Sequence, residues 1–290
     1  MLRSLFLVWV IATCAPMLVT AAPPVVYFEA ESPAGWAVAE ECNQIWLAEG
    51  ENLLAELVGP TASTDSVRCL VLDTPTFHRV FGGRLPEWGV GIALGNGRVV
   101  GLDYSRLSAV GRGVREVFLH EMVHALLFQA AEGNPIPAWL HEGAAMHYGG
   151  EWRFVDTVTL VLEGYVPDLS RLQGSFPSST QLAQRAYGTS LIAVDRLVKK
   201  HGPDVIGKLA AETRRQKSFA NAFEHVTGET EGVFAASFAA NMRLQYGWLV
   251  MVTRWPVMFV LLGILLLVGG ARKILLSRRR LAEMADDEDE

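Results

Sequence analysis

Apolar and polar positions alternate along the chain with two different periods, and the change of period predicts an α+β fold. Residues 25–29 and 67–72 are short runs rich in β-branched and aromatic side chains, as is typical of strands. Between them, residues 37–58 carry apolar side chains at helical spacing. Residues 89–103 form two short apolar runs around Gly95-Asn96-Gly97, the pattern of a β-hairpin. We therefore expect a small mixed sheet in the N-terminal part.

The second half of the chain has the pattern of successive helices. A helix that includes residues 117–127 is followed by Gly133-Asn134-Pro135, a strong stop, and Pro137 lies where another helix begins. Apolar spacing predicts five further helices, at 152–164, 181–200, 203–214, 217–226 and 231–245. This half is therefore expected to be mostly helical.

The most apolar segments lie near the two ends of the chain and predict membrane targeting. Residues 1–21 combine Arg3, an apolar run and a closing Val-Thr-Ala, as in a secretory signal peptide. The alternatives are an uncleaved membrane anchor or, because of Cys14, a lipoprotein signal. Residues 255–271 contain no charge and are apolar on every face, and with 248–252 and a snorkelling Arg254 the segment 248–271 is long enough to cross a bilayer, with a buried core helix as the alternative.

Charges after the second apolar segment predict its orientation. Five basic residues follow it closely: Arg272, Lys273, Arg278, Arg279 and Arg280. Since cytoplasmic flanks carry such an excess, the C-terminus is expected in the cytoplasm. The expected division is a signal peptide (1–21), an extracytoplasmic domain (22–247), a single transmembrane helix in the cell membrane (248–271) and a cytoplasmic tail (272–290). The acidic run 286–290 is expected to be solvated, with a docking segment as the alternative.

Overall composition adds two constraints. The formal charge of −6, with acidic residues gathered in the tail, does not indicate a nucleic-acid surface. Of three cysteines, the mature chain would keep Cys42 and Cys69. In an oxidising compartment this pair is consistent with one disulfide, and two independent buried thiols are the alternative.

One short motif carries candidate chemistry. His120, Glu121 and His124 form an HExxH motif inside a predicted helix. Positions i and i+4 lie about 40° apart around a helix, so both imidazoles can reach one metal ion. Glu121 points to the side, where a carboxylate can contact a metal-bound water, as in zinc-dependent hydrolases. The extended metzincin pattern fails, because Leu127 and Ala130 stand where it requires glycine and histidine.

A catalytic zinc usually takes three protein ligands, and spacing leaves the third open. If two helices are joined by the short turn at 133–137, His124 and Glu142 both lie on the order of 8 to 10 Å from that turn and can meet at one ion. His141 competes with Glu142, from which it is rotated by about 100°. His147 is a weaker candidate. Without a metal, two buried histidines and a carboxylate would cost roughly a few kcal/mol each.

The stretch HEMVH followed by PAWLHEGAA resembles the gluzincin clan of zinc metallopeptidases, in particular the peptidase MA-like domains. Their pattern is HExxH, a short turn, then W-L-x-E-G-x-A. The resemblance is specific over residues 114–150 and looser from about 66 to 245. It implies a zincin-like domain that binds Zn²⁺ through His120, His124 and Glu142, with Glu121 as general base. The matching frame consists of Trp139, Leu140, Gly143 and Ala145.

The resemblance also implies two further parts of the site. In gluzincins, the strand before the zinc helix is the sheet edge that pairs with extended substrate, and residues 98–102 take that place here. An ordinary hairpin is the alternative. A tyrosine or histidine from the later helices donates a hydrogen bond to the oxyanion, and Tyr187 is the best positional match. Tyr148 and His147 are the other candidates, and a structural role for Tyr187 stays open.

Together these patterns predict a membrane-anchored zinc metallopeptidase acting on a peptide or protein substrate. Glu121 would take a proton from the zinc-activated water and pass it to the leaving amine. One alternative is a zinc-binding membrane scaffold that has lost turnover. Another is hydrolysis of a different amide, such as a peptidoglycan cross-link.

Overall fold

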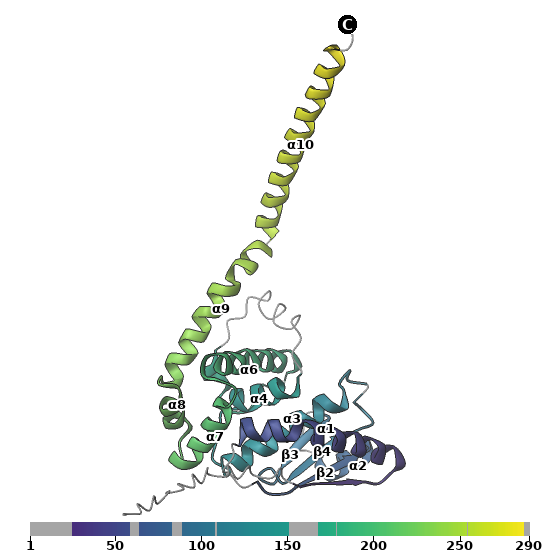
Figure 1. The fold of residues 1–290 in the computed structure, drawn as a ribbon, viewed down its shortest axis with the longest axis vertical. Coiled ribbons are helices and arrows are strands. Elements are labelled where there is room, and N and C mark those ends of the chain that lie inside the picture. The colour runs from purple at the N-terminus through teal and green to yellow at the C-terminus, as the bar shows by residue number, and fades with distance from the viewer. Residues whose placement is uncertain are drawn as a thin grey trace, which may run out of the picture.

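The computed structural model describes residues 25–58, 64–82, 89–107, 109–150, 168–177, 179–253 and 255–286. Within them, a mixed sheet is packed with helices, more helices lie beside it, and two long helices lead away from this domain (Figure 1). The expected signal peptide at 1–21 and the expected helix at 152–164 lie outside the described residues.

Four strands form one sheet in the order β1-β2-β4-β3. β1 (Val26–Ala30), β2 (Val67–Leu72) and β4 (Val99–Asp103) are parallel neighbours, and β3 (Gly91–Leu94) pairs antiparallel with β4. The register aligns one row of side chains across all four strands: Phe28, Cys69, Val100 and Ala93. The predicted strands and hairpin are therefore confirmed.

The edge strand, however, differs from the expectation. Residues 98–102 were expected at the sheet edge, but β4 is an inner strand and β3 forms the edge. A parallel pair requires a long connection, and the chain between Leu72 and Val99 supplies one, which lets β4 return beside β2. The tight hairpin then leaves β3 on the outside.

Side chains alternate across the sheet, so that each face has its own hydrophobic cluster. α1 (Pro33–Leu57) and α3 (Val114–Ala130) pack on the face that carries Cys69 and Val100, within the main core. α2 (Thr74–Phe81) packs on the other face, in a smaller cluster made of Leu72, Phe77, Phe81 and Ile92. α1 starts earlier than the predicted residue 37, because the Ser32 hydroxyl caps it by accepting a hydrogen bond from the Gly35 amide at 3.0 Å.

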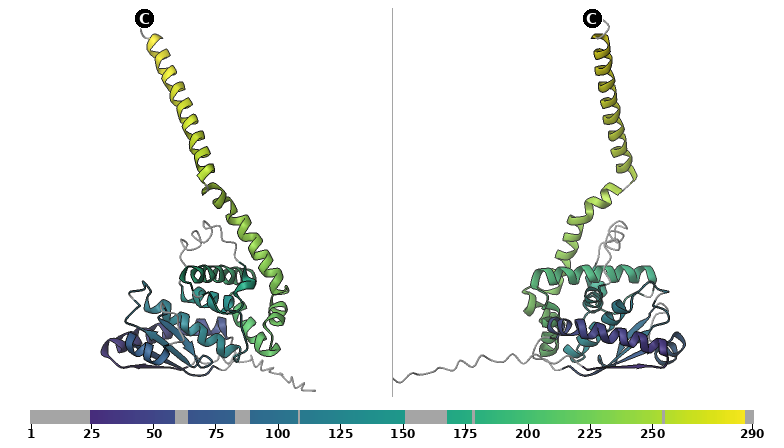
Figure 2. Two further views of the ribbon diagram at one scale, coloured as in Figure 1. Left: turned by 180° about the vertical axis from the view of Figure 1, so that it is seen from behind. Right: turned by 45° about the vertical axis from the view of Figure 1, so that its right-hand side comes forward.

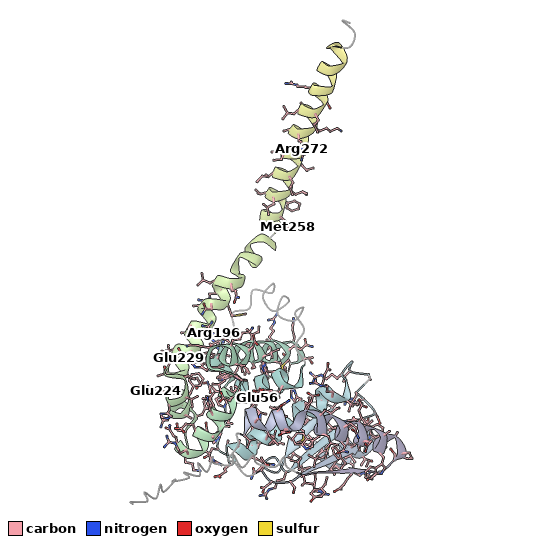
Figure 3. The ribbon with its side chains drawn as sticks, in the orientation of Figure 1. Glu56, Arg196, Glu224, Glu229, Met258 and Arg272 are labelled. Carbon is pink, nitrogen blue, oxygen red and sulfur yellow. The ribbon has the colours of Figure 1, made fainter. Side chains whose placement is uncertain are left out.

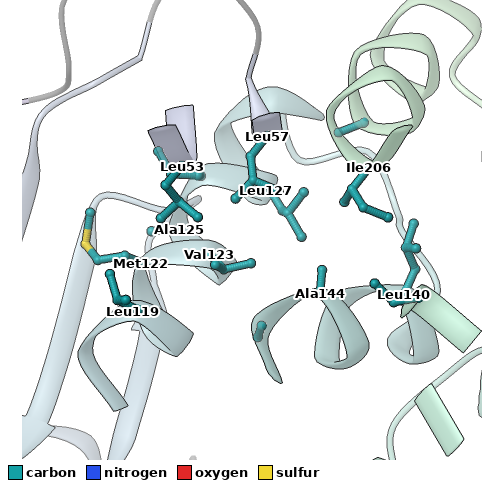
Figure 4. Packing of buried hydrophobic residues seen from close by; sticks show 14 of the residues in the cluster. Leu53, Leu57, Leu119, Met122, Val123, Ala125, Leu127, Leu140, Ala144 and Ile206 are labelled. Atoms are coloured by element: carbon teal, nitrogen blue, oxygen red, sulfur yellow. The ribbon is translucent and has the colours of Figure 1, made fainter. Parts of the chain in front are cut away.

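The helical half extends the main core. It contains α4 (Ala138–Gly149), the 3₁₀ turn η1 (Leu169–Leu172), α6 (Thr180–His201), α7 (Val205–Gln216), α8 (Phe219–Thr227) and α9 (Glu231–Thr253). The four helices predicted between 181 and 245 are thus confirmed. Leu57 of α1, Leu127 of α3, Leu140 and Ala144 of α4 and Ile206 of α7 belong to one cluster of buried residues, part of which Figure 4 shows. The two halves therefore share one core.

α10 (Trp255–Asp286) contains Met258–Arg278, a helical stretch long and apolar enough to cross a membrane. Its side chains project outward, as Figure 3 shows between Met258 and Arg272, and none of the most apolar window is buried. The views in Figure 2 show α9 and α10 leading away from the domain. The candidate span starts and ends later than the predicted 248–271, since residues 248–253 belong to α9 and the span of α10 includes Arg272 and Lys273 and ends at Arg278.

Cys42 and Cys69 are buried free thiols, and not a disulfide. Burial, with a smaller effect of the Glu41 charge, raises the pKa of Cys42 to about 12. Burial also raises the pKa of Cys69 well above its usual value. Both side chains therefore behave as small apolar groups of the core.

Candidate metal centre

Local signals in the sequence define the two helices that carry the HExxH and HEG residues. At the start of α3, the Glu116 carboxylate accepts a hydrogen bond from the Gly113 amide at 3.2 Å. α3 ends where Glu132 and Gly133 adopt positive φ angles of 49° and 72°, and α4 begins directly after Pro137. α3 and α4 pack against each other, which brings their polar residues together.

Three donor atoms from these helices converge. His120 Nε2 lies 3.1 Å from His124 Nε2, and Glu142 Oε2 lies 3.6 and 3.5 Å from these two nitrogens. Ligand bonds of about 2.0–2.2 Å in a tetrahedral arrangement place donor atoms about 3.3–3.5 Å apart. The separations therefore fit one cation, and this group could hold a metal ion. The sequence prediction that these three residues meet is confirmed.

Glu142 is electrostatically suited to a cation. Burial by itself raises the pKa of its carboxyl, but the charge on His124 and hydrogen bonds from both imidazoles lower it, and the net result is a pKa below the usual value. The carboxylate therefore stays ionised near neutral pH. Together with two imidazoles it offers one negative charge to an ion.

His141, the competing ligand, is directed elsewhere. Its Nδ1 lies 2.6 Å from Nδ1 of His124, on the side of that ring opposite the converging donors. Its ring lies nearly parallel to that of His124, at 24° with centroids 4.7 Å apart, and also contacts Phe128 at 4.6 Å. Burial, followed by the charge on His124, lowers the pKa of His141 to about 3, so the ring is neutral. Sequence spacing left both His141 and Glu142 possible as the third ligand. In the structure, Glu142 is the one that belongs to the converging donor group.

A cavity of about 470 Å³ opens beside the donor group. Glu121, His124 and Glu142 line it from the two helices, and residues 89–93 line it from β3 and the segment before it. Much of the remaining wall is apolar, while polar side chains come from the loop before α3 and from α6: Arg112, Thr180, Gln184 and Tyr187. The cavity therefore joins the donor group to the edge strand of the sheet.

Two glycines allow the close approaches that shape this cavity. A Cβ on Gly91 would stand 2.4 Å from Oε1 of Glu121, so the carboxylate of the HExxH motif lies directly against β3. A Cβ on Gly143 would stand 2.4 Å from the Ser190 carbonyl oxygen, so α4 and α6 touch next to Glu142. Gly91 was not among the residues predicted from the sequence, although the run Gly89-Val90-Gly91 at the start of the strand was a visible signal.

The three candidates for the oxyanion donor lie in different places relative to the cavity. Tyr187 on α6 is half-buried, lines the cavity and packs its ring against Phe176 with centroids 4.9 Å apart. The Tyr148 hydroxyl instead donates to the Pro203 carbonyl at 3.0 Å, and His147 packs edge-on against the Tyr148 ring at 5.0 Å. Tyr148 and His147 do not belong to the described cavity lining. Of the three, only Tyr187 faces the same space as Glu121.

The site thus consists of a donor group that could hold a metal ion, a second carboxylate beside it and a tyrosine across the same cavity. Those five residues were predicted from the sequence, whereas Phe128, Arg112 and Gln184, which also line the cavity, were not. These three residues come from separate segments that meet only through helix packing. Comparisons with protein-family models, with curated proteins and with solved structures found no match to this chain.

Proposed function

We propose that this chain is a membrane-anchored zinc-dependent peptidase. The observation that carries the proposal is the convergence of His120, His124 and Glu142 at separations suited to tetrahedral coordination, with the Glu121 carboxylate in the same cavity. Two imidazoles and one carboxylate are a common ligand set of catalytic zinc and leave one position open. Zinc bound there would lower the pKa of a water molecule and polarise a carbonyl group.

Glu121 is the proposed general base. Its carboxylate accepts the proton of the attacking water and returns it to the nitrogen of the leaving amine. Contact with Gly91 of β3 holds this carboxylate at the boundary between the donor group and the edge strand. Glu142 does not perform this role, because its oxygen is directed at the two histidines.

β3 is the proposed docking strand for the substrate. It is one of the two edge strands of the described sheet, and Val90 to Ala93 line the cavity. An extended peptide can add to such an edge through backbone hydrogen bonds, which places its carbonyl groups along the cavity. The Tyr187 hydroxyl, on the α6 side, is the proposed donor to the oxyanion that forms at the scissile carbonyl.

α10 is the proposed membrane anchor. Its uncharged residues 258–271 are followed by the basic residues Arg272, Lys273 and Arg278 to Arg280, which favour a cytoplasmic position for that end. The peptidase domain would then stand outside the cytoplasmic membrane.

Metal analysis joined to peptide cleavage tests the proposal. Purified full-length protein should contain about one zinc per chain and cleave members of a mixed peptide library, read by mass spectrometry. Glu121→Gln should keep the zinc and lose about 10²- to 10⁴-fold in rate, because proton transfer is removed. The matched control is Glu132→Gln, the same change at an exposed position just after α3. Equal rates in wild type and Glu121→Gln, with zinc present in both, would reject the mechanism.

A further inference from the structure

His124 is contacted through both of its ring nitrogens. Its Nε2 faces His120 and Glu142, while its Nδ1 lies 2.6 Å from Nδ1 of His141. Consecutive residues of α4 therefore reach the same imidazole from two sides: Glu142 at Nε2 and His141 at Nδ1. Adjacent positions on a helix are rotated by about 100°, so His141 and Glu142 point in different directions. Here that rotation lets them contact the imidazole of His124 from two sides.

The short contact between two imidazoles restricts where their protons lie. A hydrogen bond between two ring nitrogens requires one N–H and one bare lone pair. If Nε2 of neutral His124 binds a cation, its proton must lie on Nδ1, so that Nδ1 donates. Nδ1 of His141 must then accept, and the proton of His141 lies on Nε2.

His141 is held firmly in the position that this role requires. Its ring contacts that of His124, with centroids 4.7 Å apart at 24°, and that of Phe128, with centroids 4.6 Å apart. Its Nε2 is buried and has no hydrogen-bond partner among the described residues. A buried polar atom left without a partner is unusual and indicates that the ring is oriented for its other nitrogen.

We propose that His141 is a positioning residue, which fixes the tautomer and orientation of His124 so that Nε2 is presented to the metal. This inference rests on the metal site of the proposed function. Metal-bound histidines commonly donate their second ring N–H to a carboxylate or carbonyl oxygen, and here a neutral imidazole takes that place.

Zinc affinity, measured by competition with a chelator, tests the role without relying on turnover. His141→Phe keeps an aromatic ring but removes the acceptor, and should weaken zinc binding about 10- to 100-fold. His141→Asn should stay close to wild type, because its side-chain oxygen can occupy the place of Nδ1. His147→Phe is the matched control, since His147 lies on the same helix and packs on Tyr148 outside the cavity. It should bind zinc as wild type does.

The outcomes separate the inference from the function on which it rests. Wild-type protein without zinc would overturn both. Wild-type protein that binds zinc, with equal affinity in folded His141→Phe, would overturn only the role of His141.

A second measurement needs no variant and decides the question if His141→Phe does not fold. Nitrogen-15 spectra of zinc-loaded wild type should show His124 protonated on Nδ1 and His141 protonated on Nε2. A proton on Nδ1 of His141 would overturn the inference.

Discussion

α3 and α10 are both apolar around most of their circumference, yet they meet different surroundings. Eleven of the 17 residues of α3 are buried, between the sheet and neighbouring helices. Among the described residues, none of the most apolar window of α10 is buried, and its side chains project outward (Figure 3). Apolar composition therefore predicts removal from water, but it does not say whether protein or lipid replaces the water.

Polar residues distinguish the two helices. α3 interrupts its apolar run with His120, Glu121 and His124, which meet partners from α4 and β3. Residues 258–271 of α10 contain no charged side chain. A helix buried in protein can satisfy polar side chains through its neighbours, whereas a lone helix in lipid cannot.

Paired leucine truncations should show the largest difference. Leu127→Ala on α3 should lower the free energy of unfolding by about 2–5 kcal/mol, because the fully buried side chain would leave a cavity in the core. Leu265→Ala, at a position 68% exposed, should leave it unchanged. Denaturant unfolding in detergent, followed by tryptophan fluorescence, measures both. Equal losses would mean that α10 belongs to the folded core.

A charge placed in α10 tests its surroundings directly. Leu265→Arg should disfavour membrane insertion by about 2.5–3.5 kcal/mol, since the arginine would lie near the centre of the span. Membrane fractionation should show more protein outside the bilayer, while the zinc content stays unchanged. Leu265→Ile is the control. If Leu265→Arg fractionates as wild type, α10 is not the anchor.

The smallest expected effect is that of two tyrosine substitutions, one inside the cavity beside α3 and one outside it. Tyr187→Phe should reduce kcat about 10- to 100-fold, or about 1.4–2.7 kcal/mol, through loss of a donor to the oxyanion. Tyr148→Phe should leave kcat unchanged, because that hydroxyl donates to the Pro203 carbonyl. It should reduce stability by about 1 kcal/mol. Equal kcat in all three proteins would assign Tyr187 a structural role only.

Much of the secondary structure was predictable, because it depends on local hydrophobic periodicity and on the glycine, proline and asparagine residues that form turns or end helices. The hairpin around Gly95-Asn96-Gly97 is an example: all three residues have positive φ, which this sequence favours. The position of that hairpin in the sheet was not predictable. Strand order depends on long-range packing of the helices on the two faces of the sheet, which local pattern does not reveal, and so β4 rather than β3 was expected at the edge.

One part of the candidate site was likewise predictable from the sequence, and the other part was not. Spacing alone placed His120 and His124 on one face of α3, since four residues make about one turn. Tertiary packing decided the rest. The rotation of α4 against α3 directs Glu142 to the Nε2 atoms and His141 to the far side of His124. Close approaches of Gly91 to the Glu121 side chain and of Gly143 to the Ser190 backbone then shape the cavity. Periodicity within one helix is local, whereas the rotation of one helix against another depends on the whole core.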